Sequence, residues 1–356
     1  MSNPPHSILA VATRRIGDVL LVTPLLRSLR RAYPSAIIDV LVFSGKGGVL
    51  QGNPDCNGIL EVAERPAPRE HARLLRRIFR RYDLALATQP SDRSHLYAWL
   101  AAARRVGIVP DRRWSSAWKR ASCFACEVLD DVNTHTVVQN LRLADRLGVA
   151  RHYEVVAPRA EKAFASEKPY AVVHPVAMFA YKSWTPEGWK GFIAWLRGRG
   201  LAVFLTGGPS PEERAYCAAL AGAPDVVDMS GRLSFGELAQ MIRGARLYIG
   251  PDTSVTHLAA ACGTPTLALF GPSNPVKWGP WPAGATDDPS PWRMLGRPWQ
   301  RKGNVLLLQG VQPADLGSCL PCRLEGCERH IASASRCLTE MPLEPVRAAA
   351  EELLAG

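Results

Sequence analysis

The chain has 356 residues, of which 47% are hydrophobic and 21% charged, the balance of a soluble globular protein with room for two α/β domains. It contains no run of about 18 apolar residues, which excludes a helix that spans a membrane. The formal net charge of +11 indicates an anionic partner, such as nucleic acid, an acidic membrane surface or a phosphorylated substrate.

The first predicted element is a strand over residues 7–13, a continuous apolar run of the kind that is buried on both faces of a parallel sheet. Arg14 and Arg15 interrupt this run at once, which argues against a secretory signal, and the protein is expected to stay in the cytoplasm. Apolar residues then recur with helical spacing from Val19 to Leu29 and predict one helix.

Further strands and helices alternate along the chain and predict an α/β fold with two doubly wound parallel sheets. We expect a first domain over 1–155, a linker over 156–168 and a second domain over 169–340. Residues 275–318 are rich in Pro, Gly and Trp and are predicted to be irregular. A final helix in 341–356 is expected to pack back toward the first domain.

The turn after the first strand carries the first candidate for chemistry. Gly17 permits a tight turn, and Asp18 falls in the first turn of the next helix. Asp18 has two interpretations. It is either an acid favoured by the helix dipole or a general base that takes a proton from an acceptor hydroxyl.

In the second domain, residues 250–257 combine a Gly-containing turn with hydroxyl side chains at the start of a helix. The unpaired N–H groups of such a helix start suit a diphosphate. The candidate residues are Asp252, Thr253, Ser254 and His257. Each also has a structural interpretation, as a helix cap or as a polar residue of the helix.

Two other loops leave strands on the same edge of that sheet. His174 ends one strand, and Lys182 follows in the loop, where its cation either neutralises a leaving phosphate or is a solvated surface charge. Glu212 and Glu213 start the helix after the turn at 207–208. Their carboxylates either bind a ribose hydroxyl or favour the helix dipole.

Five short motifs follow one another along the chain, and they are Arg15-Ile-Gly-Asp18, Lys182-Ser-Trp-Thr-Pro-Glu187, Gly207-Gly208, Pro251-Asp-Thr-Ser-Val-Thr-His-Leu-Ala-Ala260 and Phe270-Gly-Pro-Ser-Asn-Pro275. This ordered set resembles glycosyltransferase family 9, the lipopolysaccharide heptosyltransferases and their relatives. The resemblance covers nearly the whole chain. It implies a GT-B fold, in which two Rossmann-like domains face a central cleft.

The resemblance also implies a reaction. Heptose would pass with inversion from ADP-L-glycero-D-manno-heptose to a lipopolysaccharide core or lipid A acceptor at the inner face of the inner membrane, with no cofactor in catalysis. Asp18 matches the catalytic base and Lys182 the phosphate-binding lysine. The residues expected at the donor are Gly17, His174, Glu212, Glu213, Asp252, Thr253, Ser254 and His257, with Ser254 standing where the family usually has Gly.

The basic segment over 69–81 contains an apolar stripe of Leu74, Leu75, Ile78 and Phe79. It predicts an amphipathic helix whose stripe faces its own sheet, or a basic face that meets anionic head groups or acceptor phosphates. Both hold if the helix uses its two faces. The candidate acceptor or membrane residues are Arg14, Arg15, Arg73, Arg76, Arg77 and Arg80.

The nine cysteines fall into two groups. The scattered ones are predicted to be thiols, mostly buried, and are Cys56, Cys123, Cys126, Cys217 and Cys262. The clustered ones predict a structural four-thiolate site for zinc or iron, and are Cys319, Cys322, Cys327 and Cys337. Reduced thiols or disulfides are the alternatives, and His330 is a possible substitute ligand.

Rival functions make different predictions. A GT-B nucleotide-sugar epimerase or hydrolase needs further acid/base residues, and the sequence shows no convincing second pair. A non-catalytic nucleotide-sugar-binding module predicts binding without turnover, and a protein or another glycan also fits as the acceptor. Nucleic acid is discounted, because the sequence contains no aromatic-basic array or recognition helix.

Overall fold

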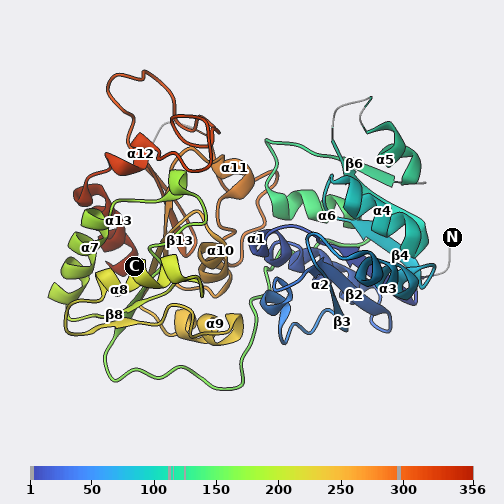
Figure 1. The fold of residues 1–356 in the computed structure, drawn as a ribbon, viewed down its shortest axis with the longest axis horizontal. Coiled ribbons are helices and arrows are strands. Elements are labelled where there is room, and N and C mark those ends of the chain that lie inside the picture. The colour runs from blue at the N-terminus through green and yellow to red at the C-terminus, as the bar shows by residue number, and fades with distance from the viewer. Residues whose placement is uncertain (1–3, 111–113, 115, 124–125, 295–297, 356) are drawn as a thin grey trace. The chain divides into compact units, whose positions relative to one another are not determined.

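The computed structural model of the chain describes residues 4–110, 114, 116–123, 126–294 and 298–355. They form two compact units (Figure 1). Unit 1 is Met1–Pro158 with Thr286–Ser290, and unit 2 is Arg159–Ala285 with Pro291–Gly356. The chain passes from one unit to the other inside the predicted linker, 156–168.

The segment Thr286–Ser290 differs from its prediction, because it belongs to unit 1 and not to the second domain. Arg151 Nη1 donates to Asp288 Oδ2 at 2.6 Å, and the backbone N–H of His135 donates to the Pro289 carbonyl at 2.9 Å. These partners are more than 130 residues apart in the chain, so no local pattern could indicate them.

Unit 1 contains a parallel sheet of six strands in the order β3-β2-β1-β4-β5-β6. The strands are β1 (Ser7–Val11), β2 (Ile37–Phe43), β3 (Gly58–Val62), β4 (Tyr82–Ala87), β5 (Ala102–Val109) and β6 (Cys126–Leu129). Leu9 of β1 lies level with Asp39 of β2 and Ala85 of β4. The central strands are continuous apolar runs because helices cover both faces of the sheet.

The helices of unit 1 are α1 (Ile16–Leu20), α2 (Thr23–Ala32), α3 (Pro68–Ile78), α4 (Asp92–Ala101), α5 (Ala117–Ser122), α6 (Thr136–Arg146) and the 3₁₀ helix η1 (Gly47–Leu50). On one face of the sheet α2 packs against α6. On the other, α4 contacts both α3 and α5. This division follows from right-handed crossovers on either side of β1.

The single helix predicted from Val19 to Leu29 is wrong, since two helices, α1 and α2, occupy this segment. The Thr23 hydroxyl donates to the Leu20 carbonyl at 2.7 Å, and Pro24 stands in the first turn of α2. Proline has no N–H with which to continue α1, but it suits the start of a helix.

Unit 2 contains seven strands in the order β12-β13-β11-β10-β7-β8-β9, of which only β12 pairs antiparallel within the described sheet. They are β7 (Tyr170–Val173), β8 (Ala202–Leu205), β9 (Val226–Asp228), β10 (Leu247–Pro251), β11 (Thr266–Phe270), β12 (Trp299–Lys302) and β13 (Val305–Gln309). The prediction that 275–318 is irregular is therefore wrong for β12 and β13. Val305–Gln309 is an apolar run that pairs with β11 and is buried.

The helices of unit 2 are η2 (Ala180–Lys182), α7 (Pro186–Gly198), α8 (Pro211–Leu220), α9 (Phe235–Arg243), α10 (Ser254–Ala261), α11 (Pro275–Trp278), α12 (Arg336–Thr339) and α13 (Leu343–Ala355). Thr185 caps α7, because its hydroxyl accepts the Gly188 N–H at 3.0 Å and Pro186 follows at the first position. No helix in the described part of the chain is long and apolar enough to cross a bilayer.

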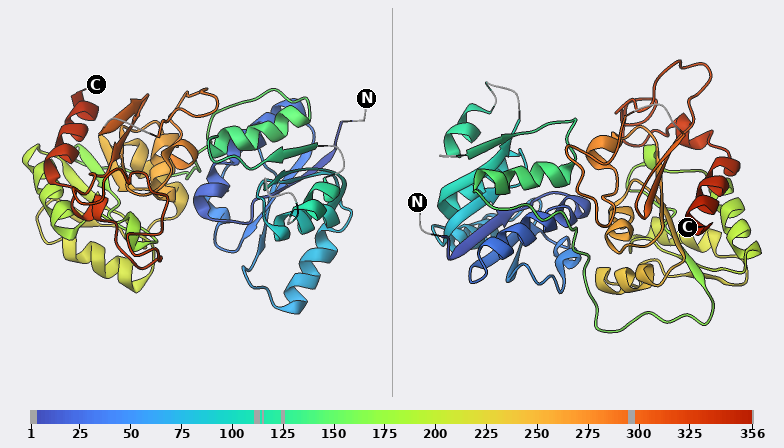
Figure 2. Two further views of the ribbon diagram at one scale, coloured as in Figure 1. Left: turned by 90° about the horizontal axis from the view of Figure 1, so that it is seen from above. Right: turned by 180° about the vertical axis from the view of Figure 1, so that it is seen from behind.

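The C-terminal helix α13 contacts α7 and strands β10, β11 and β13 of unit 2 (Figure 2). Its packing toward the first domain stays a prediction. Val346, Ala349, Ala350 and Leu353 lie in the core of that unit. The apolar face of α13 is therefore buried within unit 2 itself.

Candidate functional site

Each sheet reverses its strand order beside its first strand. In unit 1, β1 lies between β2 and β4, and in unit 2, β7 lies between β8 and β10. Ligands of doubly wound folds bind at the carboxyl ends of the strands at such switch points. The residues that follow β1 and β4 in unit 1, and β7 and β10 in unit 2, are therefore the first to consider.

At the switch point of unit 1, Asp18 stands in the first turn of α1 and is 5% exposed. Its carboxylate accepts the backbone N–H of Arg15 at 3.3 Å and Arg14 Nη1 at 3.4 Å. Asp18 therefore has the structural role of an acid at the start of a helix. The same contacts hold its carboxylate beside the carboxyl end of β1, which is also compatible with a role as general base.

Two neighbours of Asp18 carry further polar groups. Arg14 Nη1 also approaches Gln89 Oε1, at 3.5 Å, from the loop after β4. The hydroxyl of Thr13 is buried and has no hydrogen-bond partner among the described residues. An acceptor hydroxyl entering this switch point would therefore meet an oriented carboxylate together with donors and acceptors.

At the switch point of unit 2, Lys182 Nζ donates to Asp252 Oδ2 at 2.5 Å, with both side chains largely buried. Burial acts to raise the pKa of Asp252, but the charge and hydrogen bond of Lys182, with help from His257 and Ser273, leave this pKa below its ordinary value. Asp252 is therefore ionised, and the pair joins the loop after β7 to the turn after β10.

Two histidines lie at this edge of the sheet, and burial lowers the pKa of each to about 4. Asp252 opposes the shift of His257, and Lys182 adds to it. Both rings are therefore neutral near pH 7. His174 is hydrogen-bonded to the Thr206 hydroxyl at 2.9 Å, whereas Nδ1 of His257 has no partner among the described residues.

The turn predicted at Gly250 is wrong, because Gly250 and Pro251 are the last two residues of β10 and the chain bends only at Asp252 and Thr253. Hydroxyl groups support this end of the strand. Thr256 Oγ1 donates to the Pro251 carbonyl at 2.5 Å and lies 3.0 Å from the Tyr248 hydroxyl and 3.3 Å from Thr253 Oγ1. A Cβ at Gly250 would lie 2.4 Å from Tyr248 Oη, so a larger residue there would force the buried Tyr248 side chain to shift. Thr253 precedes α10 and makes no side-chain cap within the described chain, which leaves the first N–H groups of α10 available to an anion.

The two acidic candidates at the start of α8 differ. Glu213 Oε2 accepts the Gly208 N–H at 2.5 Å and so closes the turn after β8. Glu212 is exposed, and its pKa is lowered by hydrogen bonds from its own backbone N–H and from Ser210. Glu213 therefore has a structural partner, while Glu212 faces solvent.

The basic segment forms the amphipathic helix α3. Leu74 and Ile78 are buried in the core of unit 1, and the arginines are exposed. Phe79 does not belong to the buried stripe, because α3 ends at Ile78 and the Phe79 side chain is 58% exposed. Arg73, Arg76 and Arg77 lie on α3, and Arg80 follows it.

The four clustered cysteines are free thiols of graded exposure, from buried Cys337 to exposed Cys327. Burial, with smaller contributions from the charges of Cys322, Cys327 and Cys319, raises the pKa of Cys337 to about 12. No group of three or more His, Cys, Asp or Glu side chains in the described residues is placed to hold a metal ion.

His330, the possible substitute ligand, is hydrogen-bonded to Glu328 at 2.9 Å. Two sulfur atoms accept hydrogen bonds: Gln312 Nε2 lies 3.4 Å from Cys319 Sγ, and the Arg336 N–H lies 3.4 Å from Cys327 Sγ.

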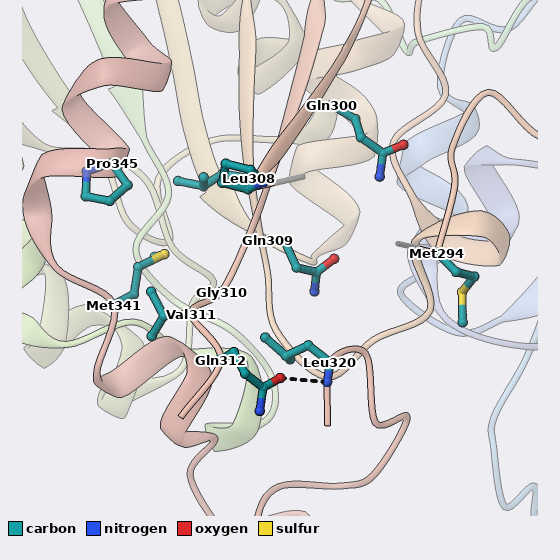
Figure 3. A pocket seen from close by; sticks show the side chains of 11 residues that line it. Met294, Gln300, Leu308, Gln309, Gly310, Val311, Gln312, Leu320, Met341 and Pro345 are labelled. Atoms are coloured by element: carbon teal, nitrogen blue, oxygen red, sulfur yellow. Dashed lines mark hydrogen bonds between the residues drawn. The ribbon is translucent and has the colours of Figure 1, made fainter. Parts of the chain in front are cut away.

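A cavity of about 340 Å³ lies at the carboxyl end of β13 (Figure 3). Gln309 and Leu308 of β13, Met341 before α13, and Leu320 of the cysteine segment line it. Gln312 also lines the cavity, and its Oε1 accepts the Leu320 N–H at 3.3 Å. β11 separates β13 from β10 in the sheet, so this cavity is not at the switch point.

The family model described as glycosyltransferase family 9 (heptosyltransferase) matches residues 71–287, more than half of the chain. The chain belongs to glycosyltransferase family 9. It is therefore a glycosyltransferase, and the family predicted from the ordered motifs is confirmed. One relative is lipopolysaccharide heptosyltransferase 3 of Escherichia coli strain K12, 28% identical over 286 residues, which are 74% of this chain and 82% of the relative.

Solved structures share the fold of this family 9 enzyme. An ADP-heptose lipopolysaccharide heptosyltransferase II of E. coli superposes with a TM-score of 0.72 at 20% identity, covering 98% of each chain. The iron-containing dodecameric glycosyltransferase TibC, from enterotoxigenic E. coli H10407, gives a TM-score of 0.55 at 15% identity over 99% of this chain and 76% of TibC. The predicted α/β fold of the GT-B heptosyltransferases is confirmed.

Two residues of this family 9 chain that contact site residues were missed in the sequence. Gln89 follows β4 and contacts Arg14, and Ser273 follows β11 and hydrogen-bonds Asp252. A weak signal existed for both, since each stands within three residues of the carboxyl end of a central strand. Ser273 was part of a recognised motif, but no role had been assigned to it.

Proposed function

We propose that the protein transfers a heptose with inversion from ADP-L-glycero-D-manno-heptose to a lipopolysaccharide core acceptor. The main support is the buried Lys182–Asp252 pair, which lies at the switch point of unit 2 and before the uncapped start of α10. In a family 9 chain this arrangement suits the diphosphate of a nucleotide sugar. The name of one neighbour, an ADP-heptose heptosyltransferase, supports the identity of the donor.

On the donor side, Lys182 and the first N–H groups of α10 would offset the charge that builds up on the departing ADP. Asp252 keeps the ammonium group in place before the donor arrives. His257 is neutral, so its unpaired ring nitrogen can make a hydrogen bond to the donor without adding a charge. Thr253 and Ser254 stand beside it at the start of α10.

On the acceptor side, we assign Asp18 as the general base. The acceptor oxygen forms a bond to the anomeric carbon as the bond from that carbon to the diphosphate oxygen breaks, and the hydroxyl proton passes to Asp18. Attack opposite the leaving group inverts the anomeric centre. Gly17 allows the tight turn that brings Asp18 to the carboxyl end of β1.

The exposed acid of α8 is the better candidate for a ribose hydroxyl. Glu213 is already tied to the Gly208 N–H, whereas Glu212 is exposed at the first turn of the helix. We therefore assign ribose binding to Glu212 and closure of the turn to Glu213. His174, whose ring is neutral and hydrogen-bonded to the Thr206 hydroxyl, would line the same site.

The acceptor of this reaction is anionic, and the arginines fit it. Arg14 and Arg15 shortly precede Asp18. The exposed arginines of α3 offer charge for core phosphates or anionic head groups at the inner face of the inner membrane. A phosphorylated acceptor also accounts for the net charge of +11.

A further part of the proposal concerns the cysteine segment, 319–337. We propose that its four thiols hold a structural zinc or iron ion away from the reaction. Free thiols, N–H···S contacts and the iron-containing neighbour TibC support this. The described arrangement does not bring three ligands together, so the segment must close around the ion.

One experiment tests the transfer itself. The purified full-length protein is incubated with a panel of nucleotide sugars, and nucleotide release is followed on addition of core-truncated lipopolysaccharide. Release of ADP from the ADP-heptose sample, dependent on the acceptor, is the expected result. Donor binding without turnover would contradict the proposal and favour a non-catalytic binding module.

A further inference from the structure

Beyond Asp92 in its first turn, the exposed residues of α4 are apolar, although α4 lies at the surface of unit 1. His95 and Tyr97 are buried against the sheet, whereas Leu96 and Trp99, three residues apart on the other side, are 39% and 44% exposed. A surface helix ordinarily presents polar side chains to water. An exposed apolar stripe therefore indicates a partner surface.

Exposed aromatic side chains continue this stripe on the α5 side. Trp118 of α5 is 43% exposed, and its ring lies 6.1 Å from that of His95, the residue before Leu96. Trp114, just before α5, is almost fully exposed.

On the other side of α4 lies the end of α3. The backbone N–H of Arg80 donates to the Leu100 carbonyl at 2.9 Å, so exposed Phe79 stands near the end of α4. We call the set Phe79, Leu96, Trp99, Trp114 and Trp118 the aromatic face.

Beside the aromatic face, α3 and the two residues after Phe79 are strongly cationic. Residues 68–81 contain six arginines and one acid, Glu70. The six arginines are exposed, and none has an ion-pair partner among the described residues. Uncompensated arginines next to exposed indoles suit a surface that offers both phosphate groups and an apolar layer.

We propose that the aromatic face and the arginines of α3 dock unit 1 on a bilayer rich in anionic phospholipids. This proposal depends on the transfer reaction proposed above in one respect: the lipid-linked acceptor of that reaction lies in such a membrane surface. Indole rings favour the boundary between head groups and acyl chains, where their apolar body and N–H are both accommodated. The arginines then lie at the level of the lipid phosphates.

A second copy of the chain fits this face less well. Pairing two such faces would bring two sets of six arginines together with one acid in each set. Like charges brought together in this way repel. An anionic bilayer supplies the opposite charge and buries the same apolar surface, so charge complementarity selects the bilayer.

Two double variants of the full-length protein test the docking. Trp99→Ser with Trp118→Ser removes indoles, and Arg73→Glu with Arg76→Glu reverses charge. The matched controls are Ile37→Ser with Ile59→Ser, exposed apolar residues of β2 and β3, and Arg31→Glu with Arg146→Glu, on the α2–α6 face. Vesicle flotation compares phosphatidylethanolamine with phosphatidylglycerol against phosphatidylcholine alone.

Wild type is expected to bind the anionic vesicles and to leave them as salt is raised, because surface charge attraction is screened. Each double variant should weaken this binding by about tenfold or more, and the controls by much less. Transfer to a lipid-free core oligosaccharide should be unchanged in the tryptophan variant, so loss of docking and failure of the transfer proposal are distinguished.

Two results would overturn the proposal. One is binding of the tryptophan variant that equals its control. The other is a wild-type dimer in solution that the tryptophan substitutions dissociate, which would assign the aromatic face to a second copy.

Discussion

Lys182 Nζ lies 2.5 Å from Asp252 Oδ2, and this ion pair links the loops after two adjacent strands, β7 and β10. The pair keeps Lys182 at the edge of the sheet where the strand order reverses. It also keeps Asp252 ionised despite its burial. In the proposed reaction, substrate binding and local stability therefore depend on the same two side chains.

Loss of Lys182 is expected to affect both properties. Lys182→Met should lower kcat/KM by about two to three orders of magnitude if it offsets charge on the leaving group. It should also lower the free energy of unfolding by about 3 kcal/mol, because Asp252 is left buried and unpaired. Steady-state kinetics and urea unfolding measure the two effects. The control is Lys190→Met, which changes an exposed lysine of α7. Unchanged kinetics in the Lys182→Met variant would show that Lys182 has no role in the mechanism.

Asp18 has a capping contact as well as the proposed base role, and the two are separable. Asp18→Asn keeps an oxygen that can accept the Arg15 N–H but cannot take a proton, so turnover should fall by about two to four orders of magnitude. The fold should be little affected. Glu237→Gln, the capping acid of α9, controls for helix-start effects. A loss of only a few fold in Asp18→Asn, with the fold intact, excludes the base role.

Stability should fall as the pH drops from about 6.5 toward 4. The pKa of His257 is about 4 in the folded chain against an ordinary 6.5, so the unfolded chain binds more protons in this window. The contribution of His257 is fully present above pH 6.5 and is lost toward pH 4, by up to about 3 kcal/mol. Buried His174 adds in the same direction.

Urea unfolding at a series of pH values measures this slope. His257→Gln should flatten it, while the exposed His6→Gln should leave it as in wild type. An unchanged slope in the His257 variant would show that its ring can protonate in place.

Gly250 should not tolerate a methyl group. In Gly250→Ala the added Cβ meets Tyr248 Oη at 2.4 Å, which should destabilise the protein by about 1–3 kcal/mol and shift the turn before α10. ADP binding, measured by calorimetry, should weaken with it. Tyr248→Phe in the same chain removes the clashing oxygen and should restore part of the stability. Failure of that rescue would place the strain elsewhere.

The cysteine segment is expected to carry about one zinc or iron ion per chain when the protein is purified under reducing conditions. Cys322→Ser should lower the metal content severalfold and destabilise the segment, because a tetrahedral site needs four ligands. Cys262→Ser, a half-buried thiol of unit 2 outside the segment, is the control. Equal metal content in the two variants would contradict the proposed site.

Local patterns were sufficient for central strands of the two sheets, although not for β12 and β13. Ser7–Val11 and Thr266–Phe270 are continuous apolar runs, and a strand buried on both faces needs little else. The capped start of α7 at Thr185 is an equally local feature, because Thr185, Pro186 and the capped Gly188 N–H lie within four residues. Such patterns gave a wrong prediction where apolar residues kept their helical spacing across the end of one helix and the start of the next, as between α1 and α2.

Contacts between residues that are far apart in the chain could not be predicted from the sequence. The apolar face of α13 does not specify its partner as a pattern, and only the structure shows that it packs on α7 and β13. Only the structure distinguishes Glu212 from Glu213, because it shows that the Glu213 carboxylate accepts the Gly208 N–H.

The sequence by itself determined the family, the two α/β halves and the candidate side chains, because periodicity, helix starts and motif order are properties of neighbouring residues. Tertiary structure alone decided which candidates meet. Lys182 and Asp252 are 70 positions apart, and Arg14 and Gln89 are 75 apart. Parallel strands bring such loops to one edge of a sheet, and the contact between their side chains depends on packing that no local pattern records.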